Sequence, residues 1–110
     1  MGCAMGLIAE VFVESLPITP TLIWNGTPLF DVGDGIKLVD YCKSNAIAVL
    51  GMEGFEIKGG KRVPCMDFII DFFASLNEVD FAAKSVEVSR EVIGSMAGRG
   101  VFLEFVLVRV

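Results

Sequence analysis

The chain has 110 residues, of which 54% are hydrophobic, and its 14 Asp and Glu against nine Lys and Arg give a net charge of −5 with no histidine. This length suits one domain around one core, so we expect residues 1–110 to form a single domain. The acidic balance argues against a nucleic-acid binder and against attraction to anionic membranes, and the lack of histidine excludes Ser-His-Asp and Cys-His catalysis and His-ligated metals.

The hydrophobic fraction exceeds the 45–50% usual for globular chains. Either the sheet is covered on both faces, or apolar surface is left for a partner. Three cysteines, Cys3, Cys42 and Cys65, fit no disulfide framework, which favours a reducing compartment and a cytoplasmic location. The N-terminus lacks the basic region of a targeting segment, and no apolar run reaches the ~18 residues of a membrane span.

Near the N-terminus, residues 7–13 suit either a strand or a short helix, because periodicity does not separate the two in so short a run. Pro17 and Pro20 then interrupt regular structure. Residues 21–24 form a short apolar run that ends at the turn Asn25-Gly26, and Pro28 makes a central strand after that turn improbable.

The spacing of apolar residues predicts a helix over 34–44, with Asp31 or Asp34 as its N-cap. Asn45 is predicted to end the helix, since asparagine tolerates the left-handed conformation. The continuous apolar run 46–50 that follows predicts an interior strand.

Glycines at 51 and 54 predict a bulge or bend in an extended segment that reaches residue 57. Gly59-Gly60 is expected at a hairpin tip, followed by a return strand over 61–64 whose pairing Pro64 limits. The apolar segment 67–73 suits either extended or helical structure.

A capping box of Ser75 and Glu78 predicts a helix over 76–97 that ends before Gly98. Its apolar face is expected to lie on the sheet through Ala82, Val86, Ile93 and Met96. Residues 101–110 are the most strongly β-forming of the chain and are placed inside the sheet. The predicted fold is therefore α+β, a single mixed or antiparallel sheet with two helices packed on it.

No motif predicts catalysis, a cofactor or a metal. The glycines at 51–54 and 58–61 lack the spacing of a phosphate-binding loop. Carboxylate pairs alone can hydrolyse glycosides, but so short a chain leaves little room for a substrate cleft. Glu53 and Glu56 face opposite sides of an extended strand unless a bulge at Gly54 intervenes. We therefore predict a protein that is not an enzyme.

The segment 52–73 is the predicted partner-binding region. It combines carboxylates with apolar side chains of the kind found at interface centres. Its candidate residues are Met52, Glu53, Glu56, Asp67, Phe68, Asp71 and Phe72. The alternative is that the aromatics belong to the core and the acids keep the protein soluble.

The order of elements over residues 22–108 resembles the bacterial immunity protein 40 family, small proteins of polymorphic toxin systems. The resemblance rests on the strand Ala46–Gly51, the Gly-Gly hairpin with Pro64, the acid-aromatic pair Asp67-Phe68, and the closing strand. Met52-Glu53 and Phe68-Ile69 stand where the family has Gly-Asp and Asn-Trp.

The resemblance implies an inhibitor that binds and neutralises a cognate toxin without catalysis. The negative charge suits a basic toxin domain. Two alternatives stay open: a homodimeric orphan protein of a mobile gene cassette with a structural, interaction or small-ligand role, and a small enzyme that uses carboxylates alone.

Overall fold

The computed structural model describes residues 9–72 and 80–109, apart from the side chains of residues 9 and 66–68. The described elements are, in chain order, β1 (Ala9–Val11), the 3₁₀ turn η1 (Val13–Ser15), β2 (Leu22–Trp24), β3 (Thr27–Leu29), α2 (Val32–Ser44), β4 (Ile47–Lys58), β5 (Lys61–Asp71), α3 (Phe81–Ser95) and β6 (Phe102–Arg109).

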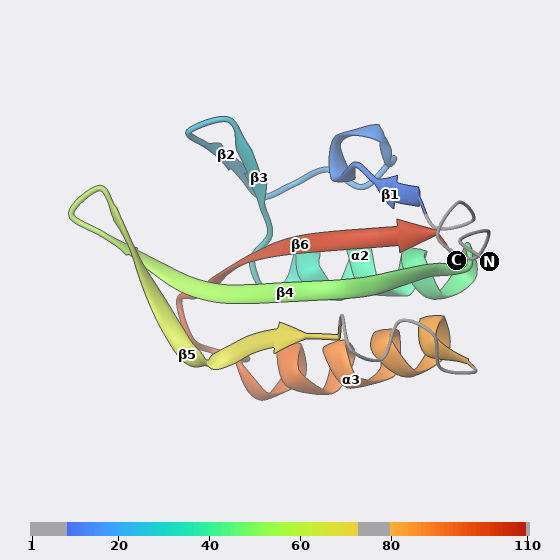
Figure 1. Cartoon of the computed structure of the whole chain (residues 1–110). Coiled ribbons are helices and arrows are strands. Elements are labelled where there is room, and N and C mark those ends of the chain that lie inside the picture. The colour runs from blue at the N-terminus through green and yellow to red at the C-terminus, as the bar shows by residue number, and fades with distance from the viewer. Residues whose placement is uncertain (1–8, 73–79, 110) are drawn as a thin grey trace.

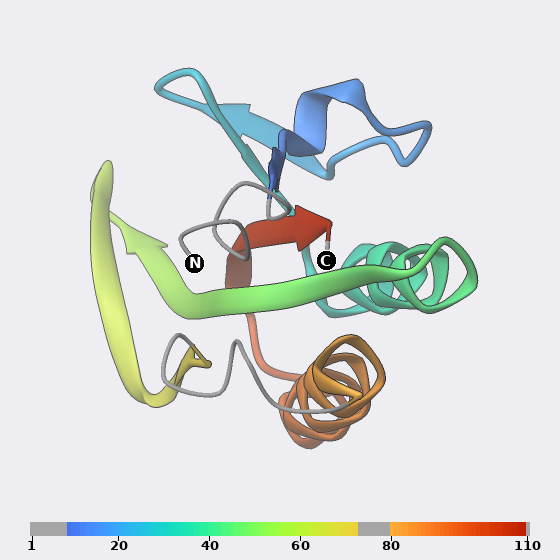
Figure 2. The same ribbon diagram turned by 45° about the vertical axis from the view of Figure 1, so that its right-hand side comes forward.

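Four strands form one antiparallel sheet in the order β1-β6-β4-β5, while β2 and β3 form a separate two-stranded ribbon. Helices α2 and α3 lie side by side on one face of the sheet (Figures 1 and 2). The predicted α+β fold with two helices is confirmed. The interior positions predicted for β4 and β6 are also confirmed, because each has a strand partner on both sides.

Helix α2 begins at Val32, two residues before the predicted residue 34, and it ends at Ser44 with Asn45 as its C-cap, as predicted. The Asp31 carboxylate accepts a hydrogen bond from the Asp34 N–H at 2.8 Å, which makes Asp31 the N-cap. Asn45, predicted to be left-handed, has φ −120°, and Ala46 takes the left-handed conformation at φ 56°. The Asn45 side chain instead donates to the Tyr41 carbonyl at 2.8 Å, so it caps the helix end through its amide.

Helix α3 is shorter than predicted. It begins at Phe81, and the predicted capping box at residues 75–78 lies outside the described residues. Val86, Ile93 and Met96 are buried against the sheet as predicted, whereas Ala82 is half-buried. Gly98, at φ +83°, follows the helix in the left-handed conformation that glycine favours there.

The core lies between the helices and one face of the sheet. Along β6, Leu103, Phe105 and Leu107 are buried in this core, while Glu104 and Val106 alternate onto the other face. α2 approaches the sheet closely at Gly35, where an added Cβ would lie 2.7 Å from Cδ1 of the buried Leu103.

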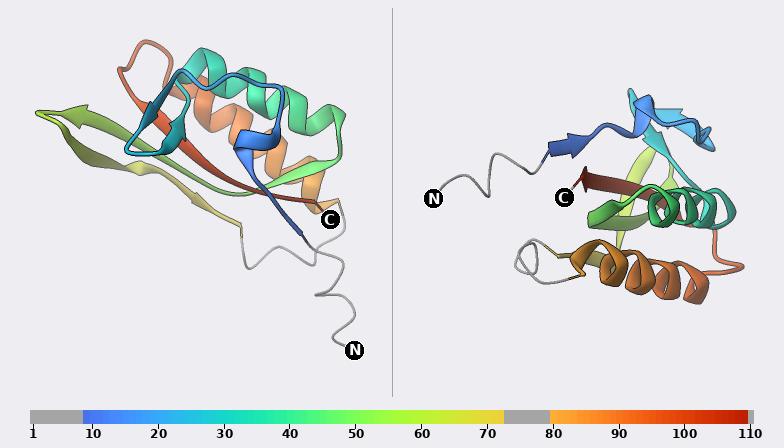
Figure 3. Two further views of the ribbon diagram at one scale, coloured as in Figure 1. Left: turned by 90° about the horizontal axis from the view of Figure 1, so that it is seen from above. Right: turned by 90° about the vertical axis from the view of Figure 1, so that its right-hand side faces the viewer.

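The predicted irregularity in β4 is confirmed on the β6 side, where the pairing shifts between Val49 and Gly51. The pairing with β5 also shifts between Glu53 and Phe55, but there the added residues lie in β5. Gly59 and Gly60 form the hairpin tip with φ +57° and +77°. The return strand does not stop at residue 64 but continues as β5 to Asp71, although its pairing with β4 is interrupted after Pro64 and resumes at Ile69. The segment 67–73, for which the sequence left extended and helical structure open, is therefore extended as far as residue 71. The hairpin bends away from the helices (Figure 2 and Figure 3, left).

A smaller cluster covers one end of the sheet face that the helices leave open. Ala48 and Val108, paired across β4 and β6, are buried there in contact with Phe81, the first residue of α3, and Phe72 packs against them. The Phe72 and Phe81 rings meet edge to face, with centroids 6.3 Å apart. Within the described part of the chain, no helix is both long enough and apolar enough to cross a membrane.

Candidate protein-binding face

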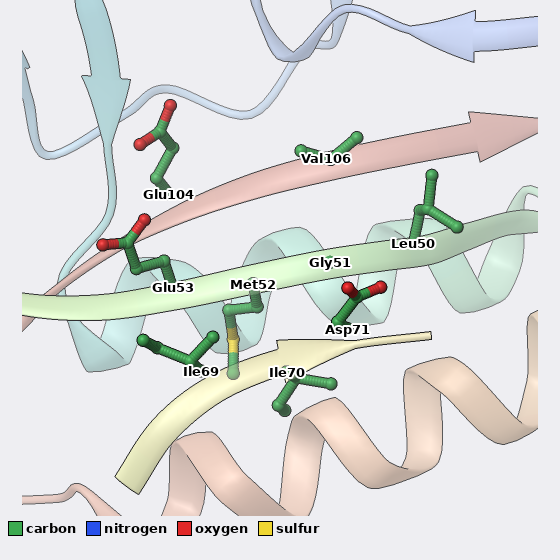
Figure 4. Close-up of a pocket in the computed structure, with 9 residues that line it drawn as sticks. All are labelled: Leu50, Gly51, Met52, Glu53, Ile69, Ile70, Asp71, Glu104 and Val106. Carbon is green, nitrogen blue, oxygen red and sulfur yellow. The ribbon is translucent and has the colours of Figure 1, made fainter. Parts of the chain in front are cut away.

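The middle of the helix-free sheet face carries a groove of about 430 Å³. We call the side chains on this side of the sheet the open face. They come from three adjacent strands and combine apolar and acidic groups (Figure 4). The open-face residues of the groove are Leu50, Gly51, Glu53, Ile69, Asp71, Glu104 and Val106.

The strand register assembles this groove. Gly51 pairs with Asp71 on β5 and with Val106 on β6, so these three positions form one row across the sheet. Glu53 pairs with Ile69 and Glu104, which gives a second row two residues away on the same face. Each row therefore joins acidic and apolar groups from different strands.

Gly51 leaves the groove floor open, because it has no side chain between Asp71 and Val106. A Cβ at this position would meet only the Ile70 carbonyl oxygen, at 3.4 Å, which is close to ordinary contact. The space above Gly51 is thus available to another molecule. Ile69 and Val106 flank it with 43% of their surface exposed, more than a monomer's core needs.

A bulge in β4 shapes one end of the groove. Val49 pairs with Leu107 and Gly51 with Val106, which leaves Leu50 as the extra residue. Val49 lies beyond the last β4–β5 pair, and its buried N–H donates to the Ser85 hydroxyl of α3 at 3.0 Å. Ser85 also donates to the Ala82 carbonyl at 3.0 Å, so the helix satisfies a backbone group that lacks a strand partner.

Arg62 links two of the groove's carboxylates. Its guanidinium lies 3.1 Å from Glu53 and 2.9 Å from Glu104, and it covers the buried Phe55 ring at 3.8 Å from the centroid. The carboxyl side chains remain 38% and 37% exposed. An ionised carboxylate has about four lone-pair sites, so each retains capacity for a donor from outside.

Only some of the predicted partner-binding residues meet in the groove. Glu53 and Asp71 lie on the open face. Glu56 faces the opposite side, where its carboxylate forms an ion pair with Lys58 at 3.2 Å. It faces that side because β4 pairs regularly with β6 from residue 51 to 55, and the extra residues of the irregular β4–β5 pairing lie in β5. The two glutamates therefore lie on opposite sides of β4.

The predicted apolar anchors are placed differently from the expectation. Met52, a candidate anchor of the partner-binding region, is 2% exposed and belongs to the helix-side core, because its neighbours Gly51 and Glu53 occupy the other face. Phe72 is half-buried and packs against the smaller cluster. The side chains of Asp67 and Phe68 lie outside the described residues.

Sequence reasoning missed Glu104 and Val106, which supply the β6 side of the groove. The alternation of Leu103, Phe105 and Leu107 with Glu104 and Val106 separates the two faces, and it is visible in the sequence. The sequence did not show that the helices cover only one face of the sheet, so it did not show which of these two sets of side chains faces outward.

Among the described residues, no three acidic or cysteine side chains are grouped so as to hold a metal ion. No family model matches the chain, and neither curated proteins nor solved structures give a match.

Proposed function

We propose that the chain is a non-catalytic, cytoplasmic binding protein of the immunity type, which neutralises a basic toxin domain by occupying it with the open face. The observation that carries the proposal is the groove over Gly51, bordered by exposed Ile69 and Val106 and by the carboxylates of Glu53, Asp71 and Glu104. The toxin as partner comes from the resemblance to the immunity protein 40 family.

The composition of the face suits a protein partner. Apolar side chains at the centre of an interface slow dissociation, while charges complementary to the partner speed encounter. The chain has a net charge of −5, and its open face carries three carboxylates beside the apolar side chains of Ile69 and Val106. Such a face is complementary to a basic protein surface.

The test is toxin neutralisation. The product of each neighbouring reading frame is expressed alone and together with the chain, and growth is compared with that of cells expressing the Gly51→Val variant. Valine fills the groove floor and suits a strand, so the fold is retained while the partner is excluded. We expect protection by the natural chain and loss of protection by Gly51→Val, with Gly94→Val on the exposed side of α3 as the control variant.

A second function, the homodimeric orphan protein, is favoured by the edge position of β5, an 11-residue strand with one strand neighbour among the described residues. Solution mass separates the two proposals. A concentration-independent dimer that does not dissociate in the presence of the toxin supports the homodimer, and a monomer that forms a one-to-one complex supports the inhibitor.

A further inference from the structure

A second hollow adjoins the groove across β6. It has a volume of about 210 Å³ and lies between the N-terminal segment and the turn that joins β2 to β3. Glu10, Phe12 and Glu14 line one side, and Gly26, Thr27 and Pro28 line the other. Glu104 borders both hollows and therefore joins them.

The charge of these two hollows has one sign. Five carboxylates line them, from Glu10, Glu14, Glu53, Asp71 and Glu104, and no described lysine or arginine does. Arg62 contacts Glu53 and Glu104 from the hairpin side, so it offsets part of this charge. A ligand with several cations is the complementary occupant.

The apolar groups of both hollows suit the stems of basic side chains. Ile69, Val106 and Leu50 surround the groove, and Phe12, with 63% of its surface exposed, borders the second hollow. Arginine buries its methylene stem on apolar surface while its head reaches a carboxylate, and its guanidinium stacks on aromatic rings. The chain itself shows this mode of binding in Arg62, which lies over Phe55 between two glutamates.

We infer that the two hollows form one continuous docking surface for an extended arginine-bearing segment of a protein, which crosses β6 at Glu104 and places one basic side chain in each hollow. This inference rests on the proposed function, because both take the open face as the surface that contacts the partner. It extends the interface to residues 10–14, which lie outside the segment predicted from sequence.

The test measures binding of fluorescein-labelled hexa-arginine to the full chain by fluorescence anisotropy at fixed ionic strength. Four variants each remove one negative charge: Glu104→Gln at the junction, Glu53→Gln in the groove, Glu10→Gln in the second hollow, and Glu87→Gln on the exposed surface of α3 as the control. Circular dichroism establishes that each variant is folded. Hexa-lysine is the second probe.

We expect Glu104→Gln to weaken hexa-arginine binding about fivefold or more and each single-hollow variant to weaken it about two- to threefold. We expect Glu87→Gln to weaken it less than about 1.5-fold. All four variants lower the net negative charge equally, but only the first three remove a carboxylate that can hydrogen-bond the bound arginine directly. Phe12→Ala is expected to reduce the preference for hexa-arginine over hexa-lysine.

Equal losses for all four charge variants, or an unchanged affinity in Glu10→Gln and Phe12→Ala, would overturn the continuous surface. Absence of any hexa-arginine binding would do the same. Neither result depends on toxin neutralisation, so the proposed function and this inference fail separately.

Discussion

Two serines one turn apart on α3 are predicted to have opposite effects on stability when each is changed to alanine. Ser85 and Ser89 are both buried, at 1% and 0% exposure. The Ser85 hydroxyl accepts from the Val49 N–H and donates to the Ala82 carbonyl, whereas the Ser89 hydroxyl has no hydrogen-bond partner among the described residues.

The magnitudes follow from these partners. Ser85→Ala leaves the buried Val49 amide without an acceptor, which costs about 1–3 kcal/mol, and the gain in helix propensity offsets at most about 0.5 kcal/mol. We expect a net loss of about 1–2 kcal/mol. Ser89→Ala removes a buried hydroxyl that lacks a partner and adds the same propensity, so we expect a gain of about 1 kcal/mol.

The assay is urea unfolding monitored by circular dichroism, with the free energy of unfolding and its denaturant dependence fitted for each variant. Ser95→Ala serves as the control, because its hydroxyl is exposed and donates only to the Val92 carbonyl of its own helix. A shift of the same sign for Ser85→Ala and Ser89→Ala would refute the assigned hydrogen bonds, and so would a loss below 0.5 kcal/mol at Ser85.

Three further predictions concern the fold. Ala46→Gly should raise the free energy of unfolding by about 0.5–1 kcal/mol. The substitution relieves the strain of a left-handed alanine at φ 56°, and this gain exceeds the loss from the greater entropy that glycine gives the unfolded chain. Thermal unfolding measures the effect, and a lower melting temperature would contradict it. Val86→Asp should prevent folding, since an unpaired charge in the core costs several kcal/mol against a total of about 5–15 kcal/mol; a folded Val86→Asp protein by circular dichroism would place the wrong face of α3 inward. Burial raises the pKa of Cys42 to about 12, so stability should be retained below pH 9 and fall as the pH rises from 9 toward 12, because the unfolded thiol ionises first; a Cys42→Ala variant with the same alkaline loss in urea unfolding would argue against this cause.

Local signals in the sequence predicted most elements because each depends on a few neighbouring residues. The carboxylate of Asp31, the Gly59-Gly60 pair and Gly98 each have a local role that the structure confirms. The left-handed residue after α2 was assigned one position early, because Asn45 has the stronger propensity but uses its side chain to bond the Tyr41 carbonyl. Propensity alone does not reveal that competing hydrogen bond.

The candidate site was only partly predictable because it depends on which sheet face the helices cover. Period-two alternation placed Glu53 and Glu56 on opposite sides, and that holds. It did not place Met52 in the core, since a methionine between a glycine and a glutamate suits either side. Glu104 joins Glu53 through strand pairing over some fifty residues of chain, a contact that no local pattern contains.

The exposed Phe12 escaped prediction for a related reason. The first residues carry only a three-residue strand and a 3₁₀ turn, and these signals are too short to orient a side chain. Pairing of β1 with the end of β6 places this segment along the second hollow.

The central claim is that the open sheet face, and not the helical face, contacts the protein partner. It is tested most directly by amide chemical-shift mapping of the isotopically labelled chain on addition of the toxin domain that the neutralisation test identifies. We expect chemical-shift changes at Gly51, Glu53, Ile69, Glu104 and Val106 and none at the outer surface of α3. Shifts confined to that outer surface, around Glu87, Val88 and Glu91, would contradict it.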